Sequence, residues 1–442
     1  GKVYRLLPTI FRYGGSYYNY LSRIKTFQEK DINEVTYLSE RLCINQINYA
    51  IENIQFYLNY HPIKTINDFK KFPIINKDVI NTNPAAFLNV KYRHRALQSN
   101  TGGSSGTPFT FYIEKGVTRP KEAAHFNWYW GRYGFHPGDK ALVIRGKPLN
   151  NNVIYEFQTI NNKLAVSCYN LNQNAIGLIH EQIQQFKPKF IHAYPSSLLT
   201  FTKELKNYLD ENQSDFQVQA IFLGSEYLFE EDKKYFEKFY QAKVVTWYGH
   251  SECLIHGAKC EFSGDYHFFP FYGYLELVDE QGNSVTKPGI EGRIIATGFD
   301  NKVMPLIRYD TGDIGVLSPR KECLCGFKGT SLSKIIGRGK DYIILKDKTK
   351  VTVTAFIFGQ HFEEFNKIKE MQIVQNEPGR IILKIVPLCV SNIGEFQTLK
   401  DKLESSVNRG LLSVELKMVE IIEKTLRGKH KMLVQNINIE EE

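Results

Sequence analysis

The feature that most constrains the fold is a series of short apolar runs separated by amphipathic stretches between about residues 98 and 336. The clearest runs are residues 141–144, 190–193, 220–223 and 244–247, each bounded by Gly, Pro or polar residues. Between them, residues 176–186 and 196–209 carry apolar side chains at helical spacing. Strands that alternate with helices of this length predict parallel βαβ units. We therefore expect ligands at the loops that follow the carboxyl ends of these strands.

The segments on either side have a different character. The first ninety residues are predicted to be mostly helical, with a helix over 31–58 and a short amphipathic turn over 66–72. After Gly273, residues 274–278 and 293–297 are predicted to form antiparallel strands joined by a turn.

A domain boundary is predicted at residues 337–341, where two glycines permit unusual backbone angles. Beyond it, we expect strands at 342–345, 368–375 and 380–386 and helices near 355–365 and 395–407. This pattern is typical of a small α+β domain. The prediction is therefore a large domain over residues 1–337 and a smaller one over 338–442.

Composition and charge exclude several classes of protein. The 442 residues are 42% hydrophobic and 23% charged, which indicates a globular chain rather than a disordered one. The net charge of +9 is modest for this length, and the densest basic stretch, 91–95, contains three cationic side chains. Binding to nucleic acid is therefore not expected. Since no apolar run is long enough to span a bilayer and no leader pattern opens the sequence, we expect a cytoplasmic protein without a membrane span.

The seven cysteines do not suggest a disulfide framework, because their number is odd and the chain is long. Cys43, Cys168 and Cys389 stand alone and are predicted to be buried thiols. The other four fall in two short segments.

The strongest local motif is the segment 99–108, with three glycines and five hydroxyl side chains. Backbone N–H groups can approach an anion closely in such a loop, and hydroxyl groups add further donors. No Gly-Lys-Ser/Thr follows at the spacing of a Walker loop. Taken alone, the segment fits a flexible linker nearly as well as a phosphate-binding loop.

Two further motifs favour the phosphate-binding interpretation. Residues 248–252 (Tyr-Gly-His-Ser-Glu) follow the apolar run at 244–247, so an aromatic ring and a carboxylate are expected in a strand-end loop. The ring could stack on a base and the carboxylate could hold a divalent cation. Residues 309–313 (Tyr-Asp-Thr-Gly-Asp) place a second carboxylate in a tight turn, suited to ribose hydroxyls. Near the C-terminus, Gly428-Lys429 lies in a basic stretch.

These motifs, in this order, resemble those of the adenylate-forming superfamily of acyl-CoA synthetases, peptide-synthetase adenylation domains and luciferases. The chain is most similar to the phenylacetate–CoA ligase-like branch, which includes members linked to capsule and surface-polysaccharide synthesis. The matching segments are 101–108, 248–252, 309–313, the Gly-Arg-x-x-Asp hinge at 337–341, Gly428-Lys429 and the adenine-side loop 224–226. The resemblance implies an α/β fold: a large N-terminal domain of βαβ sheets with a distorted β-barrel-like part, and a small mobile α+β C-terminal domain.

The resemblance also implies roles for individual residues. Glu252 would bind Mg²⁺, Lys429 would bridge the substrate carboxylate and the α-phosphate, and Arg338 would lie beside the ribose at the hinge. The residues expected to hold ATP are Thr101, Ser104, Ser105 and Gly106 at the phosphates, Gly224, Ser225, Glu226, Tyr248 and Gly249 around adenine, and Asp313 at the ribose. CoA is a candidate acyl acceptor, and an amine on a sugar or amino acid is another.

The acyl pocket of the family lies between the Gly/Ser loop and the Tyr-Gly loop. The candidate lining residues are therefore His125, Tyr194, Ser196 and His250, with Trp128, Tyr129 and Pro195 nearby. For the aromatic cluster at 125–130, ordinary helix packing is at least as good an explanation as a substrate role. For Tyr194 and Ser196, a helix N-cap is an alternative.

Two cysteine- and histidine-rich segments predict a structural zinc site. The first runs from Cys253 to His267 and the second is Cys323-Leu324-Cys325-Gly326. Our predicted ligands are Cys260, His267, Cys323 and Cys325, a choice that the resemblance to relatives with such a cluster supports. Cys253 and His256 are alternatives, and the competing explanation is that the thiols are incidental.

The predicted function is thus an ATP-dependent ligase that activates a carboxylic acid as its adenylate and passes the acyl group to CoA or to an amine. A catalytically degenerate nucleotide-binding homologue is the first alternative, and a nucleic-acid- or polysaccharide-binding protein is the second. Retention of Glu252, Asp313, Arg338 and Lys429 argues against the first, and only the mild basic excess supports the second. The acid, the acceptor and the oligomeric state do not follow from the sequence.

Overall fold

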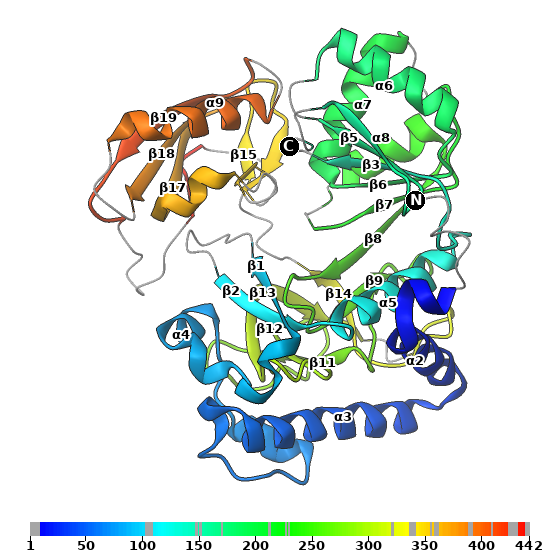
Figure 1. Ribbon diagram of the computed structural model, residues 1–442, viewed down its shortest axis with the longest axis vertical. Helices are drawn as coiled ribbons and strands as arrows, with labels where there is room; N and C mark the ends of the chain where they lie inside the picture. The colour runs from blue at the N-terminus through cyan, green and yellow to red at the C-terminus, as the bar shows by residue number, and fades with distance from the viewer. Residues whose placement is uncertain are drawn as a thin grey trace. The chain divides into compact units, whose positions relative to one another are not determined.

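The computed structural model describes residues 9–101, 109–145, 149, 153–168, 171–210, 214–225, 228, 230–319, 322–335, 342–353, 356–357, 362–387, 392–407, 410–422 and 432–437 (Figure 1). None of the helices within these ranges combines the length and the apolar character that a bilayer crossing requires.

The chain divides into two compact units, each assembled from separate stretches. Unit 1 consists of Gly1–Thr101, Phe109–Pro137 and Thr246–Arg338, and unit 2 consists of Gly102–Pro108, Gly138–Val245 and Gly339–Glu442. One break between the units falls after Arg338, at the boundary predicted from the sequence. Because unit 2 also contains 138–245, the division at 337/338 stays a prediction.

Unit 1 contains long N-terminal helices and an antiparallel sheet. Its helices are α2 (Thr9–Glu29), α3 (Ile32–Asn53), α4 (Lys77–Thr82) and α5 (Thr118–Gly131), with 3₁₀ helices at Gln55–Tyr57, Ile66–Lys71, Pro84–Phe87 and Val90–Arg95. Its strands are β1 (Ala96–Thr101), β2 (Phe109–Glu114), β9 (His256–Lys259), β10 (Tyr266–Phe268), β11 (Gly273–Val278), β12 (Glu291–Gly298), β13 (Tyr309–Leu317) and β14 (Ser331–Ile335). Strand β8 (Lys243–Gly249) begins in unit 2 and ends in unit 1.

Helix α3 shows how the N-terminal sequence determines local structure. Asp31 caps it, because its carboxylate accepts hydrogen bonds from the backbone N–H groups of Asn33 (2.8 Å) and Glu34 (2.9 Å). Residues at three- and four-residue spacings, among them Val35 and Ile47, are buried. The buried face packs against β11 and β12 (Figure 1). The helix predicted over 31–58 thus ends as an α-helix at Asn53 and continues as a 3₁₀ turn.

The sheet of unit 1 has the order β11-β12-β13-β14-β10-β9-β8, and every neighbouring pair is antiparallel. The predicted antiparallel strands at 274–278 and 293–297 are confirmed as β11 and β12. Since this order is linear, the strands described here form no closed barrel, and the barrel-like part expected from the resemblance is an open sheet.

Residues 138–245 of unit 2 have the wound α/β pattern. Their strands are β3 (Ala141–Arg145), β4 (Tyr155–Gln158), β5 (Lys163–Ser167), β6 (Phe190–Ala193) and β7 (Ala220–Leu223), in the order β7-β6-β3-β5-β4. All neighbouring pairs are parallel except β4 with β5. Helices α6 (Gln173–Phe186), α7 (Pro195–Leu209) and α8 (Glu230–Tyr240) complete this part and share its apolar core. The prediction of parallel βαβ units is therefore confirmed.

The C-terminal stretch of unit 2 has its own sheet, β19-β18-β17-β20. Its elements are β15 (Tyr342–Ile344), β16 (Lys350–Thr352), β17 (Ile368–Glu377), β18 (Arg380–Pro387), β19 (Ser413–Met418), β20 (Leu433–Gln435), α9 (Gln397–Ser405) and 3₁₀ helices at Glu363–Lys367 and Ile393–Phe396. Helix α9 lies against β19 and buries Leu399 and Leu403 (Figure 1). Of the helix predicted near 355–365, the structure describes the 3₁₀ helix that begins at Glu363.

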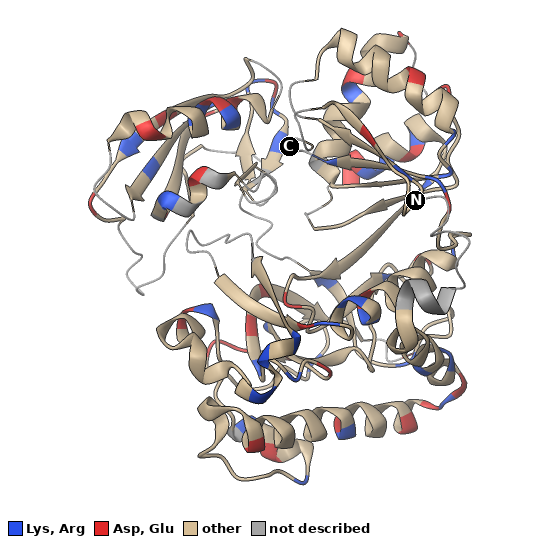
Figure 2. Cartoon of the chain, in the orientation of Figure 1, with Lys and Arg blue, Asp and Glu red and all other residues tan. Residues whose placement is uncertain are grey.

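The charged side chains are mixed in sign along the described elements. Figure 2 shows Lys and Arg interspersed with Asp and Glu on α3 and on the helices of unit 2. This distribution agrees with the modest net charge.

Candidate functional site

The first group of candidate residues lies where β8 ends. Tyr248 and Gly249 are the last residues of β8, and the loop that follows carries His250 and Glu252. Glu252 is only 8% exposed. Its Oε2 lies 3.1 Å from Nδ1 of His250, and its Oε1 accepts a hydrogen bond of 2.8 Å from the hydroxyl of Tyr309. The predicted metal-binding carboxylate is thus buried and held at both oxygens.

Strand β13 supplies the second group. Tyr309 begins this strand, and Asp313 lies on it four residues later. Oδ2 of Asp313 accepts a hydrogen bond of 2.7 Å from the hydroxyl of Tyr248. The tyrosine hydroxyl of each motif therefore donates a hydrogen bond to the carboxylate of the other motif. We call this arrangement the crossed tyrosine–carboxylate pairs. They bring Glu252 and Asp313 into one region of unit 1, as the sequence predicted.

Asp313 lies within β13 rather than in the tight turn that the sequence predicted, at a point where the pairing of β12 with β13 shifts register. Gly312 has φ +79°, a conformation that favours glycine. Its N–H donates to Oδ1 of Asp310 (2.9 Å), and Asp310 also forms an ion pair with Arg293. The hydroxyl of Thr311 donates to Ile294 O (2.9 Å) and accepts from the N–H of Asp313 (3.2 Å). Asp313 is thus positioned by its backbone, and its carboxylate accepts the hydrogen bond from Tyr248.

The surroundings of Glu252 determine its charge. Burial alone would raise the pKa of this carboxyl group, but the hydrogen bond and charge of His250 and the hydroxyl of Tyr309 outweigh it, so the pKa lies below its usual range. Glu252 is therefore ionised at neutral pH and can only accept, so the N–H at Nδ1 of His250 donates a hydrogen bond to the carboxylate. Among the described residues, Nε2 of His250 has no hydrogen-bond partner.

The other predicted nucleotide-binding residues are Thr101 in unit 1, residues that belong to unit 2, and residues outside the described ranges. Gly224 and Ser225 follow β7, and Ser225 has φ +69°, which is unusual for a residue with a side chain. The residues that the structure does not describe are Ser104, Ser105, Gly106, Glu226, Arg338 and Lys429. Thr101 ends β1, but its side chain is not described. The roles assigned to all of them stay predictions.

The predicted pocket residues fall into both units. Tyr194 is the N-cap residue of α7 without a side-chain capping bond, and its ring lies under the guanidinium of Arg145 at 4.7 Å. The side chain of Ser196 is not described. His125 is buried on α5 and packs against Tyr272 and Phe269, with ring centroids 4.8 Å and 5.1 Å away. His125 thus has the packing role that the sequence left open, and a substrate role stays a prediction.

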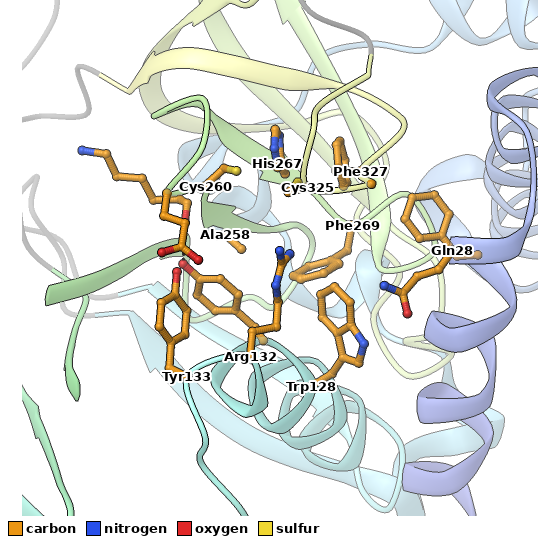
Figure 3. Close-up of a pocket in the computed structure, with 15 residues that line it drawn as sticks. Gln28, Trp128, Arg132, Tyr133, Ala258, Cys260, His267, Phe269, Cys325 and Phe327 are labelled. Carbon is orange, nitrogen blue, oxygen red and sulfur yellow. Dashed lines mark hydrogen bonds between the residues drawn. The ribbon is translucent and has the colours of Figure 1, made fainter. Parts of the chain in front are cut away.

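The four predicted zinc ligands converge in unit 1. One ligand atom from each of Cys260, His267, Cys323 and Cys325 lies within 4.8 Å of the others. Sγ of Cys260 and Sγ of Cys323 are 3.7 Å apart, close to the spacing of about 3.8 Å that a tetrahedral zinc with ~2.3 Å bonds imposes on two thiolates. Figure 3 shows Cys260, His267 and Cys325 on the wall of one pocket, together with Phe327 and Arg132.

The environment of His267 suits a metal ligand. Its Nδ1 is hydrogen-bonded to Oγ of Ser331 (2.8 Å), whereas its buried Nε2 has no partner among the described residues. Phe327 stacks parallel to the ring, with centroids 4.2 Å apart. Burial lowers the pKa of His267 to about 4, so the imidazole is neutral near pH 7, as a zinc ligand must be. A second hydrogen bond of this kind commonly orients ligating histidines. The alternatives Cys253 and His256 are not in this cluster.

Two residues with clear roles in these sites had no role assigned from the sequence. Tyr309 belongs to the Tyr-Asp-Thr-Gly-Asp motif but has no predicted role of its own, although its hydroxyl donates a hydrogen bond to Glu252. Ser331 lies in a strand without any motif, yet it orients His267. Sequence spacing carries no signal for either contact, because both partners are brought together by tertiary structure. The expected burial of Cys43 and Cys168 is confirmed, and Cys389 lies outside the described residues.

Comparison with known proteins gives relatives that match most of the chain. Residues 344–436 match the family model of the CapK C-terminal domain. The chain is 24% identical to protein CapK of Staphylococcus aureus over 443 aligned residues, which cover 96% of this chain and 94% of that protein. It is 25% identical to the phenylacetate-coenzyme A ligase of Aromatoleum evansii over 339 residues, which cover 68% of this chain and 69% of the relative.

Solved structures show the same fold. The chain is similar to 2-hydroxyisobutyryl-CoA ligase, crystallised with 2-HIB-AMP and CoA, with a TM-score of 0.60 and 18% identity, over 90% of this chain and 89% of that one. This likeness agrees with the mixed α/β architecture described above. The resemblance found in the sequence motifs is therefore confirmed: the chain is similar in sequence to CapK and to phenylacetate-coenzyme A ligases, and similar in fold to an acyl-CoA ligase.

Proposed function

We propose that this protein is an ATP-dependent ligase that activates a carboxylic acid as an acyl-adenylate, releases pyrophosphate, and transfers the acyl group to CoA or to an amine. The names of its relatives support the first part of this proposal, since several are coenzyme A ligases. The resemblance to members linked to surface-polysaccharide synthesis supports an amine on a sugar as the alternative acceptor.

The observation that carries the proposal is the pair of crossed tyrosine–carboxylate contacts. Glu252 and Asp313, which are sixty-one positions apart in the sequence, are joined through Tyr309 and Tyr248 by hydrogen bonds of 2.8 Å and 2.7 Å. A nucleotide needs an aromatic surface for its base, an acceptor for its ribose hydroxyls and a metal-binding carboxylate near its phosphates. Tyr248, Asp313 and Glu252 supply these three groups from one region of unit 1.

The carboxylate of Glu252 fits a magnesium ion. A carboxylate offers about four lone-pair directions, and hydrogen bonds from His250 and Tyr309 use one on each oxygen. Magnesium prefers oxygen ligands and keeps several waters, so one or two carboxylate contacts suffice. A bound ion would neutralise phosphate charge that otherwise repels the attacking substrate carboxylate.

Several of the remaining functional groups lie in segments that the structure does not describe. We assign the phosphates to Thr101, Ser104, Ser105 and Gly106, and the neutralisation of charge at the α-phosphate to Lys429. We place Arg338 at the hinge between the two predicted domains. A cation at the α-phosphate is expected to stabilise the transition state by several kcal/mol, roughly a hundredfold or more in rate.

We also propose that Cys260, His267, Cys323 and Cys325 bind one structural zinc ion. Four protein ligands leave no open position, which is typical of a structural rather than a catalytic zinc site. The ligands come from the segment after β9, from β10 and from the segment before β14, so the ion would cross-link parts of unit 1 that are distant in sequence.

The decisive experiment is acid-dependent ATP–pyrophosphate exchange, measured with a panel of aryl, alkyl and amino acids. We expect exchange with at least one acid, and a loss of about a hundredfold or more in Glu252→Gln. Glu29→Gln, which changes an exposed glutamate of unit 1, is the matched control and should exchange at the unaltered rate. Tight ATP binding without exchange for any acid would instead favour the degenerate nucleotide-binding homologue.

A further inference from the structure

A pair of buried histidines lies in unit 1 beside the proposed reaction site. His125 on α5 is 1% exposed and His256 on β9 is 3% exposed, with ring centroids 6.4 Å apart. Aromatic rings surround the pair: His256 lies 4.5 Å from Phe126 and 5.2 Å from Phe269, and His125 lies 4.8 Å from Tyr272. We call these five side chains the histidine cage.

The hydrogen-bonding state of the cage is unusual. Nδ1 of His125 lies 2.8 Å from the carbonyl oxygen of Lys121, which can only accept, so Nδ1 carries the proton and Nε2 is left as an acceptor. That Nε2 and both ring nitrogens of His256 are buried and have no hydrogen-bond partner among the described residues. A buried polar atom left unsatisfied costs roughly 1–3 kcal/mol. Three in one cage are difficult to explain by packing alone.

The cage is also electrically neutral. The ammonium of Lys121, which lies 4.0 Å from the ring centroid of Tyr272, is already engaged by Cys253 O (3.3 Å), Tyr272 O (3.2 Å) and the carboxylate of Asp300 (3.4 Å). Burial lowers the pKa of His125 to about 3 and that of His256 well below its ordinary value, so both rings are uncharged near pH 7. The cage therefore offers neutral acceptors and aromatic surface, not a site for an ion.

The strand pairing places the cage next to the proposed reaction site. His256 on β9 lies directly opposite Gly249 on β8, the glycine of the Tyr-Gly loop that leads to Glu252. The backbone of Phe269 in turn donates to the carbonyl of His256 (3.0 Å). The cage therefore adjoins, along β8 and β9, the segment that carries Glu252.

We propose that the histidine cage holds the distal end of the acid substrate, and that this end carries a neutral hydrogen-bond donor, a hydroxyl or amide N–H group, on an aromatic or short aliphatic frame. Because Nε2 of His125 can only accept, the ligand must donate to it. His256 can accept from or donate to the same group. The inference rests on the proposed function and adds the class of acid to it.

The test uses matched acids that differ by a hydroxyl group in place of a methyl group. The pairs are 4-hydroxyphenylacetate with 4-methylphenylacetate, and 5-hydroxypentanoate with hexanoate, each measured by pyrophosphate exchange. We expect kcat/KM for the hydroxy acid of at least one pair to exceed that for its methyl partner by about a hundredfold, because a polar site rejects an analogue that leaves its groups unpaired. In His125→Phe and His256→Phe this ratio should fall to within about threefold. His94→Phe, at an exposed position, is the matched control and should keep it.

A second measurement needs neither substrate nor turnover. In the wild-type protein with ¹⁵N-labelled histidines, phenol is expected to shift the Nε2 resonances of His125 and His256, assigned from the two variants, whereas toluene is not. Equal responses to phenol and toluene, or shifts confined to exposed histidines, would overturn the proposal and leave buried water as the partner of these nitrogens. If both members of each acid pair support pyrophosphate exchange equally, and the histidine variants do not change this ratio, the cage proposal is overturned while the ligase function stands. Absence of exchange with every acid would remove the ligase function, and the phenol experiment would still decide on the cage.

Discussion

At the scale of single residues, the contact between Tyr309 and Glu252 is the one most open to a direct test. Tyr309 is 5% exposed, and its ring stacks on that of Phe109 at 6.1 Å, so its hydroxyl is held in place by packing. A hydrogen bond to a charged group contributes about 1.5–3 kcal/mol. Tyr309→Phe would remove this bond while the ring keeps its volume.

We expect Tyr309→Phe to raise the Mg²⁺ concentration that gives half-maximal pyrophosphate exchange by about tenfold to a hundredfold, since 1.4 kcal/mol corresponds to a factor of ten. Its thermal midpoint should change much less. Tyr37→Phe, in which an exposed tyrosine of α3 loses its hydroxyl, should leave the Mg²⁺ dependence unaltered. An unchanged Mg²⁺ requirement in Tyr309→Phe would show that the hydroxyl does not position Glu252 for a metal.

The buried histidines predict a dependence of stability on pH. The pKa of His125 is about 3 in the folded protein and near 6.5 when the chain is unfolded, so between these values the unfolded chain binds more protons. The stability associated with neutral His125 is therefore complete above pH 6.5 and is lost as the pH falls towards 3. Each such histidine contributes up to about 1.4 kcal/mol per pH unit.

Thermal unfolding followed between pH 7 and pH 4.5 checks this prediction. The midpoint of wild-type unit 1 should fall as the pH decreases, and the fall should be shallower in His125→Phe. His94→Phe, which changes an exposed ring, should retain the wild-type slope. Parallel slopes for His125→Phe and the wild type would contradict the prediction.

At the scale of elements, the sheet of unit 1 depends on a close approach at Gly273, the first residue of β11. A Cβ atom added there would lie 1.7 Å from the carbonyl oxygen of Leu254, which is backbone and cannot rotate away. We expect Gly273→Ala to destabilise unit 1 by about 3 kcal/mol or more, measured by denaturant unfolding. Gly15→Ala, where the structure gives no atom within 4 Å of the added Cβ, should be neutral or slightly stabilising in helix α2.

The zinc ion that we propose would join elements in the same way that a covalent link does. Metal analysis of the purified protein is expected to give one zinc per chain, and Cys323→Ser should lose both the metal and part of the thermal stability of unit 1. Ser331→Ala should weaken zinc binding about tenfold to a hundredfold by releasing His267, whereas Ser333→Ala, two residues along β14, should not. Protein that contains no stoichiometric zinc would refute the assignment.

Sequence patterns predicted the local elements better than the contacts between them. The strands predicted at 190–193 and 220–223 match β6 and β7. An apolar run this short, bounded by Gly, Pro or polar residues, is typical of a fully buried strand in a parallel sheet. The convergence of Cys260, His267, Cys323 and Cys325 was also predictable, since thiols and imidazoles in two short segments suggest one metal site. The contact of Tyr309 with Glu252 was not, because it depends on where β13 lies relative to the loop after β8.

At the scale of the whole molecule, the C-terminal stretch has a core of its own. One cluster of buried residues runs from Ile343 to Leu433 and contains members of this stretch alone, and it coincides with the CapK C-terminal domain at 344–436. We therefore expect a fragment of residues 342–442 to fold by itself, with a cooperative thermal transition in circular dichroism. Leu399→Asp, which buries a charge under α9, should abolish that transition, whereas Leu416→Asp at a less buried position should perturb it less. A fragment without a transition would favour a C-terminal stretch that requires the rest of unit 2.

The crossed tyrosine–carboxylate pairs have a consequence for the order in which ligands act. Because Tyr309 and Asp313 share one strand and Tyr248 and Glu252 share one short segment, a shift of either backbone would loosen both hydrogen bonds together. The first ligand to bind, nucleotide or magnesium, would then immobilise the residues that bind the second ligand. Less conformational entropy would therefore be lost when the second ligand binds. Such linkage is reciprocal, so the two would bind with positive cooperativity.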